Sequence, residues 1–308
     1  MRLTLLLALS AICAMGSICA ALSAETLSID VGGLQRSALM ERPATQSPLP
    51  ALIMLHGAGG NAATLDRLTG LGQLAAREGF VAVFPESIAR FWNDGRPEHA
   101  EFLRQRGALG DDAAFIAALV TDLVKRGIAD PRRIFIAGFS NGGLMALRMA
   151  CTAPGLFAGA GAISGSVPLT PDECRPSASL SLVLMNGTAD PVMPYAGGRV
   201  GQGRGSSQGS VWGTDRTLEV FRQADGCAGD PANLTLPGAT EDATPVTVQQ
   251  WSQCAAGTVL LYRIEGGGNR IPGSLAAGPG LDATAGRKAM SFSAGLALWS
   301  FFRDKSRP

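Results

Sequence analysis

The sequence predicts an α/β fold in which helices cover both faces of a mostly parallel central sheet. Short apolar runs that are typical of buried strands alternate along the chain with segments of helical periodicity. The 308 residues are 46% apolar and 17% charged, a composition that provides enough apolar surface for one large core. The 40 glycines follow no period, so collagen-like and low-complexity chains are excluded.

The first third of the chain predicts a hairpin and then alternating strands and helices. Apolar and polar residues alternate from Leu27 to Val31, Gly32-Gly33 follows, and a second extended run reaches Met40. Together these features indicate a β-hairpin. The next expected elements are a buried strand at 51–55, a helix over 62–78 and a strand at 80–84.

The rest of the chain continues this alternation. Asp111-Asp112 can cap a helix whose apolar face runs from Phe115 to Val124, and Gly127 ends that helix. Further strands are expected at 133–137, 157–163, 180–185 and 258–264, and further helices at 142–150, 214–225 and 286–303. Because the pattern resumes after the Gly/Ser-rich stretch 197–210, we interpret that stretch as a loop and residues 25–308 as a single domain.

Residues 1–24 have the layout of a secretory signal peptide. Arg2 precedes an apolar run from Leu5 to Met15, and small residues lead to Ala24, after which we expect cleavage. The uncharged stretch is also long enough for a transmembrane anchor. We favour the signal peptide because small residues gather at the end of the stretch and no positive stop follows. The mature protein is then expected in the periplasm or the extracellular space, with no membrane segment.

The composition also restricts the partners. The chain has 26 basic and 25 acidic residues, and Arg2 is the only charge before Glu25, so the mature chain carries 25 of each sign. A neutral chain without basic runs does not favour nucleic acid as the main partner. With two histidines, no metal-ligand spacing and no dinucleotide fingerprint, the sequence indicates no metal site and no cofactor. It does not indicate an oligomeric state.

Four cysteines, Cys151, Cys174, Cys227 and Cys254, follow the predicted signal peptide. Their spacing is not that of a zinc site, and an exported protein meets an oxidising compartment, so we expect two disulfides. Three pairings are open. The pairing of sequence neighbours, Cys151–Cys174 and Cys227–Cys254, closes compact loops and is the one we expect. Four buried free thiols are the alternative.

The segment Gly138–Gly142 has the sequence GFSNG and matches the GxSxG pattern of a nucleophile elbow. An apolar strand precedes Ser140 and a helix follows it, so its hydroxyl is expected above the sheet edge and near a positive helix terminus. Ser207 lies in a second match, but no strand precedes it, and we discard it. A plain strand-to-helix turn is the alternative for Ser140.

Two further turns follow predicted strands and complete a catalytic framework. The glycine-rich turn that starts at His56 can present the backbone N–H of Ala58, together with that of Asn141, to a developing oxyanion. The motifs of phosphate-binding loops do not occur, and an ordinary turn is the alternative. Asp190 follows a later strand and is the acid expected in the chain order serine, acid, histidine, with an Asp-Pro turn as the alternative.

The chain resembles the secreted polyhydroxybutyrate depolymerase and feruloyl esterase group of α/β-hydrolases. The matching stretches run in family order over almost the whole mature chain: Leu55–Gly57, Phe91–Gly95, Asp111-Asp112, Gly138–Ala146, Gly187–Pro191, Pro194–Gly198, Asp225–Cys227 and Leu298–Phe302. The resemblance implies an α/β-hydrolase fold and a serine carboxylesterase with Ser140 as nucleophile and Asp190 as acid. It also implies an oxyanion hole near Ala58 and Asn141, and both disulfides.

The sequence departs from this family at the catalytic histidine. The family's GGGHxWPG segment reads GGGNRIPG at Gly266–Gly273, with Asn269 in the histidine position. An amide is not a base at neutral pH, so Asn269 cannot take the proton of Ser140. The two histidines of the chain are His56 and His99. We expect His56 to hold the oxyanion turn by hydrogen bonds and His99 to be an exposed loop residue, and service as a substitute base is the alternative for each.

Two functions are therefore compared. The first is an exported ester hydrolase that acts through an acyl-Ser140 intermediate on small esters or on oligomeric hydroxyalkanoate or aryl esters. The second is a catalytically silent relative that binds an ester, acyl or carbohydrate ligand. Asn269 and Asn186 favour the second, because the family has histidine at the first position and often at the other. A scaffold role has no support in the sequence.

Aromatic residues in loops are candidates for a substrate cleft. Trp92, Tyr195 and Trp212 are of this kind, and His56 joins them because it lies in the oxyanion turn. Side chains that cap the core are the alternative. The sequence shows no polymer-binding module after the domain, which favours soluble oligomers or small esters over a crystalline polymer.

Overall fold

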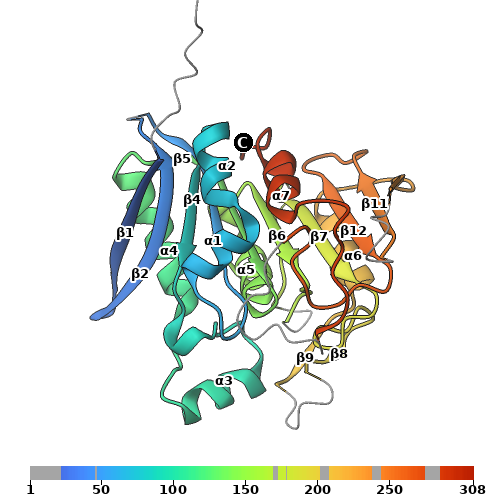
Figure 1. Cartoon of the computed structure of the whole chain (residues 1–308), viewed down its shortest axis with the longest axis horizontal. Helices are drawn as coiled ribbons and strands as arrows, with labels where there is room; N and C mark the ends of the chain where they lie inside the picture. The colour runs from blue at the N-terminus through green and yellow to red at the C-terminus, as the bar shows by residue number, and fades with distance from the viewer. Residues whose placement is uncertain are drawn as a thin grey trace, which may run out of the picture.

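A ten-stranded sheet with helices on both faces forms the body of the protein and confirms the predicted α/β class (Figure 1). The computed structural model describes residues 22–45, 47–168, 173–177, 179–201, 208–237, 244–274 and 285–308. Most of the predicted signal peptide lies outside these residues, as does Ser207 of the second GxSxG match.

The sheet has the strand order β1-β2-β4-β3-β5-β6-β7-β12-β11-β10. Its strands are β1 (Leu22–Val31), β2 (Leu34–Pro43), β3 (Leu49–Leu55), β4 (Val81–Pro85), β5 (Ala129–Phe139), β6 (Gly159–Ile163), β7 (Ser181–Gly187), β10 (Ala232–Leu236), β11 (Val246–Trp251) and β12 (Val259–Ile264). The six central strands, which are β4, β3, β5, β6, β7 and β12, run parallel to one another. Antiparallel strands extend the sheet at both edges. A separate two-stranded sheet joins β8 (Gly198–Arg199) to β9 (Ser210–Val211).

The described residues form seven α-helices, which pack on the sheet or border it. They are α1 (Ala62–Thr69), α2 (Leu71–Glu78), α3 (Pro97–Gln105), α4 (Asp112–Lys125), α5 (Asn141–Thr152), α6 (Thr214–Ala224) and α7 (Ala294–Phe302). One apolar cluster joins the sheet to α4, α5 and α6, and a second joins it to α1, α2 and α7. Alternate side chains of β3 point to opposite faces of the sheet, so Ile53 and Leu55 belong to the first cluster and Leu52 and Met54 to the second.

Two predicted helices are shorter in the structure, and glycine contributes to both differences. The helix expected over 62–78 is split at Gly70, whose φ of 67° is left-handed and whose N–H donates to the carbonyl of Asp66. The helix expected over 286–303 covers only 294–302, since Gly286 has a φ of 85° and Ser293 caps the helix start. The helical pattern does not predict α3, because only His99 and Leu103 of that helix are buried.

Three observations relate to the predicted export: the disulfides, the start of strand β1 and the search for membrane-spanning helices. The four cysteines form the disulfides Cys151–Cys174 and Cys227–Cys254, the pairs that were expected. Strand β1 begins at Leu22, so its first three residues belong to the predicted signal peptide, and they pair with residues 41–43. Within the described part of the chain, no helix has the length and apolar character needed to cross a membrane.

The parallel strands bring the candidate site residues to one edge of the sheet. Ser140 follows β5 directly, and His56 follows its neighbour β3. Asp190 lies three residues after β7, and Asn269 lies five residues after β12. The carboxyl ends of neighbouring parallel strands share one edge, which is where α/β proteins place their sites.

Candidate active site

A sharp turn between β5 and α5 carries Ser140, which has φ 54° and ψ −121°. Such a conformation is strained for a residue other than glycine and is typical of a nucleophile elbow. Glycine is needed on both sides of it. A Cβ on Gly138 would lie 2.2 Å from the carbonyl oxygen of Gly142, and a Cβ on Gly142 would lie 2.4 Å from that of His56. The elbow and the oxyanion turn are therefore in direct backbone contact.

Two backbone N–H groups at this contact are available to bind an anion. Asn141 is the first residue of α5, so its N–H has no acceptor within the helix. The N–H of Ala58 has no hydrogen-bond partner among the residues that the structure describes, whereas the next two N–H groups of its turn donate to backbone carbonyls. These are the two donors that the sequence predicts for the oxyanion hole.

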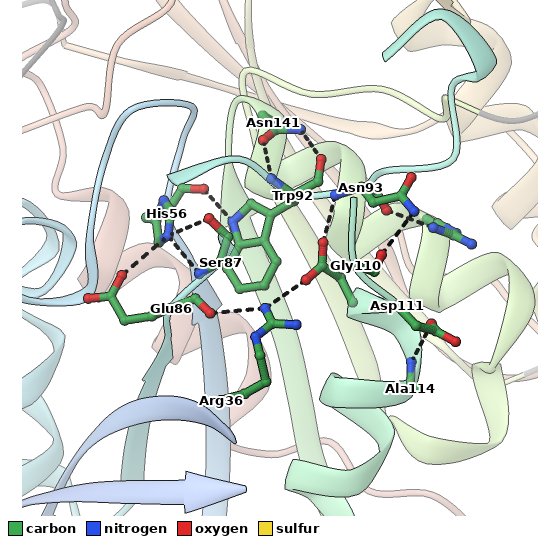
Figure 2. Close-up of polar contacts among 12 residues, drawn as sticks. Arg36, His56, Glu86, Ser87, Trp92, Asn93, Gly110, Asp111, Ala114 and Asn141 are labelled. Carbon is green, nitrogen blue, oxygen red and sulfur yellow. Dashed lines mark hydrogen bonds and ion pairs between the residues drawn. The ribbon is translucent and has the colours of Figure 1, made fainter. Parts of the chain in front are cut away.

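Both histidines hold backbone segments of this framework. His56 Nδ1 lies 2.8 Å from the carbonyl oxygen of Gly57, so Nδ1 carries the proton and donates. His56 Nε2 then accepts the N–H of Ser87 at 3.3 Å (Figure 2). His99 is 1% exposed and lies in α3, which corrects the expectation of an exposed loop residue, and its Nε2 donates to the carbonyl oxygen of Trp92 at 3.1 Å. Burial lowers the pKa of both imidazoles, and none of these hydrogen bonds involves Ser140.

Asp190 and Asn269 meet where the acid and the histidine of a triad would meet. Asn269 Nδ2 donates to Asp190 Oδ2 at 2.9 Å, and Asp190 Oδ1 accepts the N–H groups of Val192 and Met193, each at 2.8 Å. Asp190 is 8% exposed and Asn269 3%. Burial raises the pKa of Asp190 to about 6, although these hydrogen bonds act to lower it. The amide thus takes the hydrogen bond of a triad histidine without supplying a base.

Asn186, the second position at which the family often has histidine, is saturated by hydrogen bonds. Its Nδ2 donates to the carbonyl of Gly165 at 3.0 Å and to Thr214 Oγ1 at 2.9 Å. Its Oδ1 accepts the N–H of Gly165 at 3.0 Å. The side chain therefore ties the end of β7 to the loop after β6 and to the start of α6, and it has no role in proton transfer.

The raised pKa of Asp190 predicts a loss of stability as the pH rises from about 4 to about 6. The folded chain holds this proton more tightly than the unfolded chain, in which a carboxyl titrates near 3.9. The contribution to stability is therefore complete below that value and is lost as the pH passes the folded pKa of about 6. Denaturant titrations should show that the free energy of unfolding of wild type, relative to Asp190→Asn, falls by about 2 kcal/mol between about pH 4 and pH 7. If the difference in free energy of unfolding between wild type and Asp190→Asn does not change with pH, the raised pKa of Asp190 is contradicted.

The side chain of Asn141 is held by the loop that precedes α3. Asn141 Nδ2 donates to Asp94 Oδ2 at 2.7 Å. Its Oδ1 accepts the N–H of Trp92 at 2.8 Å (Figure 2). Asp94 is fully buried and accepts Arg96 Nη2 at 2.7 Å and Nε at 2.9 Å. Burial acts to raise the pKa of Asp94, but the charge and hydrogen bonds of Arg96 outweigh it and hold that pKa below its usual range. Sequence reasoning missed these roles, and the only signal was the place of Asp94 in the matching stretch Phe91–Gly95.

The candidate cleft residues occupy different environments. His56 and Trp92 are 1% and 0% exposed, and Trp92 Nε1 donates to the carbonyl oxygen of His56 at 2.8 Å. Both side chains brace the oxyanion turn from inside, which corrects their interpretation as cleft residues. Tyr195 and Trp212 line one pocket of about 460 Å³. Its wall residue Val211 belongs to a small apolar cluster with Leu144 of α5, so the pocket adjoins the helix that follows the elbow.

Comparison with known proteins finds esterases among the relatives of this chain. A family model described as esterase PHB depolymerase matches residues 36–194, slightly more than half of the chain. NocK of Nocardia uniformis subsp. tsuyamanensis, assigned as an esterase, is 30% identical over 75% of this chain and 68% of its own length. Feruloyl esterase B of Piromyces equi is 25% identical over 71% of this chain, which spans only 39% of that enzyme. An acetyl xylan esterase from Aspergillus awamori shares the fold, with a TM-score of 0.54 at 13% identity over 78% of this chain and 92% of that one.

Proposed function

Since the chain belongs to the esterase family of the PHB depolymerases, we propose that it is an exported carboxylic ester hydrolase with an acyl-Ser140 intermediate. The observation that carries the proposal is the elbow, in which a strained Ser140 lies beside two available backbone N–H groups. An ester carbon placed there receives Ser140 Oγ, while the carbonyl oxygen binds the N–H groups of Ala58 and Asn141. The apolar N-terminal stretch and the two disulfides support export.

The reaction has two steps in which the missing base matters. In the first, the bond from Ser140 Oγ to the acyl carbon forms, the alcohol leaves, and the serine proton ends on the alcohol. In the second, water attacks the acyl group, the carboxylic acid leaves, and Ser140 regains a proton. Asn269 cannot carry either proton, so solvent must do so. Removal of triad members lowers turnover by up to roughly 10⁶-fold and leaves roughly 10³–10⁴-fold over water, and we expect turnover in that lower range.

We propose small esters and oligomeric hydroxyalkanoate or aryl esters as substrates. Two relatives of this chain are named as a feruloyl esterase and as a poly(3-hydroxybutyrate) depolymerase, which supports esters of aromatic or hydroxyalkanoic acids. The pocket lined by Tyr195 and Trp212 adjoins α5 and provides an aromatic wall close to the elbow.

A second candidate function is a silent relative that binds an ester, acyl or carbohydrate ligand. The observation that favours it is the hydrogen bond of 2.9 Å from Asn269 to Asp190. This contact satisfies the buried acid and keeps the site ordered without catalytic chemistry. The saturated amide of Asn186 fits the same function.

Hydrolysis of p-nitrophenyl acetate and butyrate separates the two functions. We expect the wild type to exceed Ser140→Ala in kcat/KM, because Ser140 Oγ can still attack the ester with solvent as the proton acceptor, whereas alanine leaves only the oxyanion donors. Ser207→Ala is the matched control, since it changes the serine of the second GxSxG match and should leave the rate unchanged. Equal rates in wild type and Ser140→Ala would reject the hydrolase and leave the binding function.

A further inference from the structure

Asp94 and Arg96 form a buried ion pair directly behind the elbow. Asp94 is 0% exposed and Arg96 1%, and Asp94 Oδ2 accepts both Arg96 Nη2 and Asn141 Nδ2 at 2.7 Å. Trp92 completes the contact, since its N–H donates to Asn141 Oδ1 at 2.8 Å and its carbonyl accepts Asn141 Nδ2 at 3.1 Å. The Asn141 amide group thus makes three hydrogen bonds to one short segment. We call Trp92, Asp94 and Arg96 the Asn141 clamp.

We propose that Asp94 is a positioning residue that aims the backbone N–H of Asn141 at the oxyanion, an inference that rests on the proposed function. The Asn141 side chain and that N–H belong to the same residue, so fixing the amide group restricts how the first turn of α5 can rotate. The neighbouring Ser140 has φ 54° and relaxes unless its surroundings hold it. The clamp supplies this restraint on the helix side of the elbow.

The positive charge of Arg96 compensates the negative charge of Asp94 behind the oxyanion hole. An unpaired carboxylate behind the oxyanion hole would repel the negative charge that develops on the substrate. Arg96 neutralises Asp94 through two hydrogen bonds and is itself held by Gln208, whose carbonyl oxygen accepts Arg96 Nη1 at 2.7 Å. Asp94 therefore accepts strongly from Asn141 while adding little net charge near the reacting oxygen.

Phenylboronic acid tests this without turnover. Ser140 Oγ adds to boron, a B–O bond forms and one proton passes to the buffer, which leaves a tetrahedral anion with oxygen in the oxyanion hole. We expect Asp94→Asn to weaken this binding at least roughly tenfold, since loss of a whole oxyanion donor lowers kcat by roughly 10²–10³. Asp130→Asn is the matched control, because Asp130 also pairs with an arginine, Arg133 at 2.7 Å, but lies at the start of β5, the opposite end of that strand from Ser140. It should change the affinity less than about twofold.

The outcomes separate the positioning role from the proposed function. Binding to wild type that Ser140→Ala abolishes and Asp94→Asn weakens, with Asp130→Asn close to wild type, supports the inference. Equal affinities of wild type and folded Asp94→Asn overturn it and leave the proposed function intact. Equal affinities of wild type and Ser140→Ala overturn the proposed function and the positioning role with it. Circular dichroism melts confirm that each variant is folded at the assay temperature.

Discussion

The Asn269→His variant is expected to hydrolyse p-nitrophenyl acetate at least roughly a thousandfold faster than the wild type. The Asn269 amide donates to Asp190 Oδ2 at 2.9 Å. The Nδ1–H of histidine leaves the same Cγ and can make the same hydrogen bond, which leaves Nε2 as an acceptor for the proton of Ser140. Asp190 would then hold the tautomer and stabilise the imidazolium. Steady-state kinetics at pH 7–8 measure the gain.

Asn269→Gln is the matched control for this gain. Glutamine also changes the size of the side chain at this position, but it supplies no base, so its rate should not exceed that of wild type. A histidine variant that is no faster than the glutamine variant would show that the missing base is not what limits the wild type.

Arg96→Met is expected to lower the free energy of unfolding by about 3–5 kcal/mol. Methionine fills part of the space of the arginine stem but leaves Asp94 fully buried without its cation. The carboxyl must then take up a proton or bring in water, and either change disturbs its contact with Asn141. Urea titration at neutral pH, followed by circular dichroism, measures the loss.

The double variant Asp94→Asn/Arg96→Met shows whether the uncompensated charge causes this loss. The amide removes the buried charge, so the double variant should be more stable than Arg96→Met alone. A double variant that is less stable than Arg96→Met would show that the packing and the hydrogen bonds of Arg96, rather than its charge, dominate.

The elements that could be predicted from the sequence are those in which local pattern and environment agree. The run at 51–55 and the run before Ser140 are apolar on both faces, and both are buried parallel strands. The turn at Ser140 was predictable because GxSxG lies between a strand and a helix, and because both glycines are needed for backbone contact. Asp190 was placed by its position after a strand, which the parallel sheet brings to the same edge.

The parts that could not be predicted depend on contacts between segments far apart in the chain. Asn141 makes a hydrogen bond to Asp94, which is 47 residues away in the sequence, and Arg96 makes one to Gln208, which is 112 residues away. No local pattern distinguishes such a buried ion pair from two exposed charges. The same holds for Trp92, whose side chain is buried only because the loop before α3 folds back onto the oxyanion turn.

If Ser140 is the nucleophile of a site that lacks only its base, the gain of Asn269→His must depend on that serine. The direct measurement is the turnover of p-nitrophenyl acetate by Asn269→His and by Ser140→Ala/Asn269→His, each compared with Ser140→Ala. We predict that the double variant loses the whole gain and falls to the rate of Ser140→Ala alone. A double variant that keeps the rate of Asn269→His would contradict the assignment of Ser140 and of the site around it.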